Sequence, residues 1–140
     1  MKIKNGAKVF IKNPKLNKYL FQLRDNKPNI PNPNVWSLFG GGIESGETPI
    51  QALKRELKEE SNIIIYNIKL LDTKKIILKV NNINYAVESN IFIANTDFEL
   101  KEIKFYEGRD IKYFSLDEIK NNKQITQGMC KLLDKYKKYL

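Results

Sequence analysis

The sequence contains no histidine and only one cysteine, Cys130, among its 140 residues. A single cysteine cannot form an internal disulfide, and without histidine the usual Cys/His zinc sites are excluded. Any metal ion held by this chain must therefore be bound by oxygen ligands. Histidine is also the commonest general base, so acid–base chemistry would fall to Asp, Glu, Lys or Tyr side chains.

Long apolar runs are also missing, since no stretch approaches the roughly 20 residues that a membrane span requires. The first residues, Met1 to Asn5, lack the apolar core of a signal peptide. We therefore expect no membrane partner and a cytoplasmic location. A length of 140 residues with 41% apolar content suits one domain spanning residues 1–140.

Arginine is scarce, although the formal net charge is +9. Only Arg24, Arg55 and Arg109 occur among 25 basic residues, whereas arginine is the preferred side chain for bidentate phosphate and base contacts. A nucleic-acid partner is therefore not expected. The acids are unevenly placed, because residues 44–60 hold five of the sixteen, and this acidic segment is the first indication of a functional site.

Strand and turn signals indicate an α+β fold. Proline and asparagine predict a turn at Pro14, an irregular loop over 25–34 and a second turn at Asn81 and Asn82. Alternating or short apolar runs predict strands between these signals. The expected strands are 8–11, 19–24, 36–39, 63–71, 75–80, 85–94 and 111–114.

Capping signals predict the helices. Thr48 as N-cap, Pro49 at the first helical position and Gln51 as capping-box partner start a helix over residues 49–60. Asn62 would end it by adopting the left-handed conformation. Ser115 starts a second capped helix, and helical spacing of apolar residues over 125–140 predicts a C-terminal amphipathic helix.

Three carboxylates lie within an arc of about 100° on the helix over residues 49–60, namely Glu56, Glu59 and Glu60. Like charges at these spacings repel by roughly 0.2 to 0.5 kcal/mol per pair, and a hard divalent cation would remove that repulsion. For the trio alone, an acidic surface face with Arg55 pairing Glu59 is the better explanation. The glycines at 40–42 favour a site, because a glycine loop before a helix lets backbone groups approach phosphate or metal.

A longer pattern contains these residues and resembles the Nudix box of MutT-related proteins. Gly41, Glu47, Arg55-Glu56-Leu57 and Glu59-Glu60 are separated by five, seven and one residues. The resemblance extends from about Val9 to Ile119 and implies a Nudix-type α/β/α sandwich with a curved mixed β-sheet between helices. Three positions depart from the usual pattern: Asn62 replaces glycine, Phe39 replaces proline and Arg109 replaces glutamine.

The resemblance also implies roles for individual residues. Glu56, Glu59, Glu60 and the carbonyl of Gly40 would bind Mg²⁺, with Mn²⁺ as an alternative cation. Arg55 would orient the glutamates and Glu47 would support the loop, while Arg24 and Gly41 would contact substrate. The general base would be Glu56 or Glu59 on the helix, or Glu107 on a loop after the sheet.

The expected activity is Mg²⁺-dependent cleavage of a diphosphate linkage in a nucleotide-like substrate, foremost a nucleoside triphosphate, including oxidised ones, to monophosphate and pyrophosphate. Hydrolysis of a nucleoside diphosphate sugar is an alternative within the same class. A Nudix-fold binding module without catalysis is an alternative from another class, although the intact carboxylates argue against it. The sequence leaves open whether the chain is a monomer or a homodimer.

Overall fold

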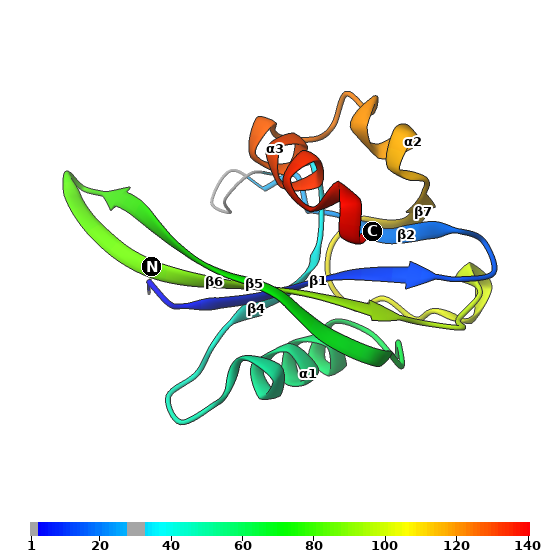
Figure 1. Cartoon of the computed structure of the whole chain (residues 1–140), viewed down its shortest axis with the longest axis horizontal. Helices are drawn as coiled ribbons and strands as arrows, with labels where there is room; N and C mark the ends of the chain where they lie inside the picture. The colour runs from blue at the N-terminus through cyan, green and yellow to red at the C-terminus, as the bar shows by residue number, and fades with distance from the viewer. Residues whose placement is uncertain (1–2, 28–32) are drawn as a thin grey trace.

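The computed structural model describes residues 3–27 and 33–140. A twisted mixed sheet lies between α1 (Pro49–Glu60) on one face and α2 (Leu116–Lys120) with α3 (Gln127–Tyr136) on the other (Figure 1). The predicted α/β/α sandwich is therefore confirmed. Within the described stretches, no helix is both long and apolar enough to cross a membrane.

The central strand of the seven-stranded sheet is β1 (Gly6–Asn13). It pairs in parallel with β6 (Ile83–Asn95) and antiparallel with its other partners, so the sheet is mixed. The remaining strands are β2 (Lys18–Leu23), β3 (Trp36–Ser37), β4 (Phe39–Gly42), β5 (Tyr66–Val80) and β7 (Asp110–Phe114). Because β1 pairs with β6 only from Ser89 onward, the β5–β6 hairpin extends past the rest of the sheet (Figure 1).

Two strand predictions need correction. The expected strand 36–39 is interrupted at Leu38, because β3 pairs with β2 whereas β4 pairs with β1. The glycines at 40–42 consequently belong to a strand and not to a loop. The expected strands 63–71 and 75–80 form one continuous β5, which starts only at Tyr66, since no proline or glycine separates them. Its register against β6 shifts near its start. The turn at Asn81 and Asn82 is confirmed by their positive φ angles of 51° and 63°.

The helix over residues 49–60 is confirmed, including the reciprocal capping bonds between Thr48 and Gln51. The helix ends where predicted, but the predicted left-handed conformation of Asn62 is wrong. Ser61 ends α1 in extended conformation at φ −162°, and Asn62 is not left-handed. Instead, the Asn62 side chain accepts from Lys104 N at 2.8 Å and donates to Glu102 O at 3.0 Å. These long-range bonds fix the exit of α1 next to the segment before β7.

The C-terminal elements follow the prediction with shorter bounds. Ser115 caps α2 through the amide of Glu118, and Thr126 caps α3. The amphipathic segment 125–140 is helical as α3 and then tightens into the 3-10 helix η2 (Lys137–Tyr139); a further 3-10 helix, η1 (Leu100–Glu102), precedes β7. Of the predicted loop 25–34, residues 28–32 lie outside the described residues.

The strand alternation of β1 divides the core into two layers. Ala7, Val9 and Ile11 pack in the cluster that contains Leu53 of α1. Phe10 points to the opposite side and packs in the cluster that contains the helical residues of α3. Lys8 lies between Ala7 and Val9, so the period of two places its side chain on the same side as Phe10.

Candidate active site

The carboxylates of α1 differ sharply in their exposure. Glu60 is 4% exposed, Glu56 is partly buried and Glu59 is exposed. The Glu56 carboxylate lies directly against β4, because a Cβ atom on Gly41 would come within 2.4 Å of Glu56 Cδ. Any side chain at position 41 would therefore displace this carboxylate, which explains a glycine here without reference to backbone conformation.

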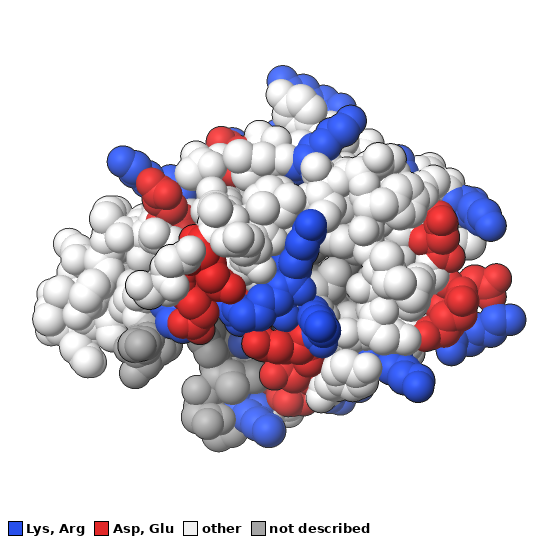
Figure 2. Space-filling view, turned by 90° about the horizontal axis from the view of Figure 1, so that it is seen from below, with Lys and Arg blue, Asp and Glu red and all other residues white. Residues whose placement is uncertain are grey.

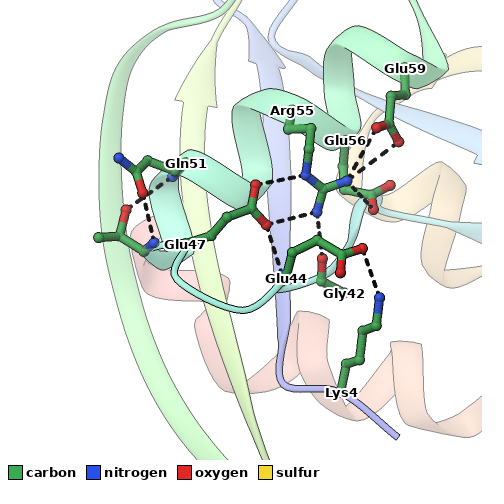
Figure 3. A network of polar contacts seen from close by, with 9 residues as sticks. Lys4, Gly42, Glu44, Glu47, Gln51, Arg55, Glu56 and Glu59 are labelled. Carbon is green, nitrogen blue, oxygen red and sulfur yellow. Dashed lines mark hydrogen bonds and ion pairs between the residues drawn. The ribbon is translucent and has the colours of Figure 1, made fainter. Parts of the chain in front are cut away.

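Arg55 connects the loop after β4 to the helix (Figure 3). Its Nε and Nη2 donate to the two oxygens of Glu47 at 2.7 and 2.9 Å, and Nη2 also donates to Gly42 O at 2.9 Å. Its Nη1 donates to Glu56 at 3.1 Å and to Glu59 at 3.3 Å. The guanidinium bonds hold the pKa of Glu47 below its usual value, assisted by the Glu44 amide. A single arginine side chain thus forms ion pairs with three glutamates.

Acidic and basic side chains mingle over the face of the molecule that carries α1 (Figure 2). Their pairing removes most of the like-charge repulsion expected from the sequence. Glu60 is the exception, because its hydrogen-bond donors are neutral: Gln22 Nε2 at 2.9 Å and the Gly40 amide at 3.3 Å. Burial accordingly raises the pKa of Glu60 to about 7, against the lowering effect of these bonds and of the nearby Lys8 charge.

A polar hollow of about 470 Å³ opens beside this end of α1. It brings together most of the residues predicted for the site. It is lined by Gln22, Arg24, Asp25, Lys27, Gly40, Glu56, Glu60, Tyr106, Glu107 and Gly108. Glu59 is not in this lining, because its carboxylate turns toward Arg55 at the surface, and Glu47 and Arg55 act on the hollow only through Glu56.

A second hollow of similar volume, about 470 Å³, adjoins the first. It is mainly apolar and lies between the sheet and α3. Its lining comprises Lys8, Arg24, Val35, Trp36, Ser37, Leu38, Ser89, Ile91, Thr126, Met129 and Leu132. Since Arg24 lines both hollows, they form neighbouring parts of one candidate site, one polar and one apolar. Of the two aromatic residues next to the glycines, Trp36 lines the apolar hollow, whereas Phe39 is fully buried in the core.

Sequence reasoning missed Lys8. Burial lowers the pKa of its ammonium group, while the charge of Glu60 acts in the opposite direction. The signal was available in the alternation of β1, because a lysine between Ala7 and Val9 on the Phe10 side points inward and not to solvent.

The donor chemistry of the polar hollow fits a hard divalent cation, because carboxylate and backbone carbonyl oxygens are its preferred ligands. Within residues 3–27 and 33–140, however, no three acidic side chains are already gathered at metal-binding distance. Glu56 and Glu59 are instead paired with Arg55, at 3.1 and 3.3 Å.

Comparison with known proteins agrees with this architecture. The profile of the NUDIX domain family matches residues 2–136. An 8-oxo-dGTP diphosphatase of Haemophilus influenzae is 54% identical over 33 residues, which are 24% of each chain. One of Proteus vulgaris is 53% identical over 38 residues, 27% of this chain and 34% of the relative. The matches thus span between about a quarter and a third of the length of these curated relatives.

Solved structures resemble the whole chain. A MutT NUDIX hydrolase from Burkholderia pseudomallei has a TM-score of 0.73 at 20% identity, covering 96% of this chain and 98% of that one. A dihydroneopterin triphosphate pyrophosphohydrolase from E. coli has a TM-score of 0.72 at 16% identity, covering 99% and 100%. At such low identity, these likenesses establish the fold.

Proposed function

Because this chain belongs to the Nudix domain family, we propose that it is a Mg²⁺-dependent pyrophosphohydrolase that cleaves a nucleoside triphosphate to monophosphate and pyrophosphate. The observation that carries the proposal is the pair of adjoining hollows. One is lined by the box carboxylates and the other by aromatic and aliphatic side chains, and Arg24 belongs to both. A nucleotide has the same division, with an anionic chain at one end and a flat, largely apolar base at the other.

The activities of similar proteins support a triphosphate substrate. Two curated relatives are 8-oxo-dGTP diphosphatases, and one structural neighbour is a dihydroneopterin triphosphate pyrophosphohydrolase. The sequence identity to the former is concentrated in a short stretch, so the oxidised guanine nucleotide is one candidate among the nucleoside triphosphates that a substrate screen has to include.

In this proposal Glu56, Glu60 and the carbonyl of Gly40, which all line the polar hollow, would hold Mg²⁺, and Glu59 would be a further ligand. Mg²⁺, when bound, supplies charge neutralisation of the diphosphate and a lowered pKa for water. Arg24, which lines both hollows, would bind the phosphate chain where they meet. Its planar guanidinium suits bidentate phosphate contacts.

A carboxylate must accept the proton of the attacking water. Glu56 and Glu107 both line the polar hollow, which supports either of them as this base. Glu59 faces Arg55 instead and would reach the hollow only after rotation. We therefore rank Glu56 and Glu107 ahead of Glu59 as general base.

The test is product analysis with a panel of nucleoside triphosphates, including 8-oxo-dGTP, and nucleoside diphosphate sugars, with Mg²⁺ and with excess EDTA. We expect pyrophosphate and monophosphate from triphosphates with Mg²⁺ and no turnover with EDTA. Mn²⁺ should restore activity. Undiminished hydrolysis in EDTA would refute the metal dependence, and cleavage of the sugars alone would replace the proposed substrate class. Complete inactivity towards the panel would favour a binding module.

A further inference from the structure

Lys8 occupies an unusual place for a lysine. It lies on the central strand β1, opposite Gly40 of β4 and Ile91 of β6, and its side chain lines the apolar hollow beside Trp36, Met129 and Leu132. Lysine rarely faces the interior without a partner, because desolvating an ammonium group is unfavourable.

The ammonium group of Lys8 is influenced by the charge of Glu60 but is not bonded to any described side chain. No hydrogen bond or ion pair joins Lys8 Nζ to any residue in the described stretches, and its interactions with Glu60, Arg24 and Glu56 are through-space only. A partly buried donor without an acceptor calls for an explanation. A ligand in the apolar hollow would supply the missing acceptor.

The position of Lys8 also separates it from the phosphate end of the site. Arg24 lines both hollows, but Lys8 lines the apolar one and is absent from the lining of the carboxylate hollow. If the phosphate chain lies beside Glu56 and Glu60, then Lys8 is placed to meet the base.

We propose that Lys8 is a specificity-determining residue that selects nucleotides with a keto base, namely guanine, uracil or thymine, over those with an amino base, adenine or cytosine. The inference rests on the proposed function, because it assumes a nucleotide lying across both hollows.

The chemical reason is that an ammonium group has three donors and no acceptor. Guanine O6 and thymine O4 are carbonyl acceptors, whereas adenine N6 and cytosine N4 are donors at the equivalent positions. Lys8 would hydrogen-bond a keto base and face a second donor on an amino base. An unpaired buried donor is penalised strongly, so the discrimination should be clear.

The first experiment compares kcat/KM for the matched pairs GTP against ATP and UTP against CTP. The native protein should prefer the keto member of each pair by roughly tenfold or more. In Lys8→Met, which keeps a long apolar side chain, both ratios should fall toward one, and Lys8→Gln should behave likewise. Lys79→Met, at an exposed position of the β5–β6 hairpin, is the matched control and should keep the native ratios.

A second readout does not depend on catalysis. Trp36 is the only tryptophan in the chain and lines the hollow in question, so its fluorescence should report base binding. Titration with GMP, AMP, UMP and CMP should give tighter binding for the keto nucleotides, and the difference should vanish in Lys8→Met. Circular dichroism would verify that the variants fold, as expected when an unpartnered ammonium group is replaced by an apolar side chain.

The outcomes separate the two proposals. No hydrolysis of any triphosphate, together with keto-selective binding at Trp36, would refute the proposed activity but support the role of Lys8. Hydrolysis without keto preference, or with ratios unchanged in Lys8→Met, would overturn the role of Lys8 and leave the activity standing. An equal loss of kcat/KM for all four nucleotides would show that Lys8 contacts phosphate, which also overturns the base reading. No fluorescence response to any nucleotide would overturn it as well.

Discussion

Glu60 offers the sharpest test of the site, because its burial predicts a measurable dependence of stability on pH. The variant is Glu60→Gln, which retains the shape and the acceptor for Gln22 but has no charge to desolvate. Burial raises the pKa of Glu60 from 4.5 to about 7. Each pKa unit corresponds to about 1.4 kcal/mol, so the shift amounts to about 3 kcal/mol between the protonation states.

The direction of this pH dependence of stability follows from proton binding. The folded protein holds the Glu60 proton more tightly than the unfolded chain, so this group contributes stability below pH 4.5, and the contribution is lost as pH rises through about 7. Without metal, the free energy of unfolding of the native protein relative to Glu60→Gln should therefore fall by about 3 kcal/mol across this window. That is a large share of the 5 to 15 kcal/mol by which typical domains are stable.

The assay is urea denaturation in EDTA at pH 4.5 to 8, with both proteins compared at each pH so that other titrating groups cancel. Glu59→Gln, at an exposed position of the same helix, controls for loss of one helix charge. At pH 8, Mg²⁺ should stabilise the native protein more than Glu60→Gln, because it binds only the folded state. A difference curve that stays flat from pH 4.5 to 8 would refute the reasoning.

Three further predictions concern the surrounding residues. Gly41→Ala should lower kcat about 100-fold with little change in Tm, because a Cβ would meet the Glu56 carboxylate. Gly42→Ala is the control, since its Cβ would meet only a flexible lysine side chain. Equal activities of the two variants would contradict the predicted clash. Arg55→Lys should lower Tm by about 3 °C and raise the Mg²⁺ concentration needed for activity, since lysine cannot reproduce the bidentate contact with Glu47. Thermal melts and Mg²⁺ titrations that match those of the native protein would contradict this prediction. At saturating Mg²⁺, the general base should be whichever of Glu56→Gln and Glu107→Gln remains slower by roughly 10²- to 10⁴-fold in single-turnover assays, and native rates for both would exclude the pair.

The parts of the fold that local chemistry determines could be predicted from the sequence. The start of α1 is an example, because Thr48, Pro49 and Gln51 form a complete capping signal within four residues. The end of α1 is a counterexample. Its geometry depends on hydrogen bonds from the Asn62 side chain to residues 102 and 104, which are 40 and 42 positions away. No local sequence pattern predicts such contacts.

The candidate site divides in the same way. The spacing of the box glutamates indicated the acidic end of the site, but it could not show that Glu59 turns to the surface while Glu60 is buried. That difference depends on Gln22 of β2 and Gly40 of β4, which both donate hydrogen bonds to Glu60. The apolar hollow was not predicted either, because its lining combines residues of β1, β3, β6 and α3 that meet only in the folded chain.

The arrangement of charges explains how α1 accommodates three glutamates near its C-terminal end. Arg55 neutralises Glu47, Glu56 and Glu59 through one guanidinium group, which offsets the repulsion that the local sequence would otherwise impose. It does not reach Glu60, whose bonds come from neutral donors. The acid left without a bonded cation is therefore the buried one, where an uncompensated charge is most unfavourable. Glu60 would therefore gain most from a divalent cation held in the polar hollow that it lines together with Glu56.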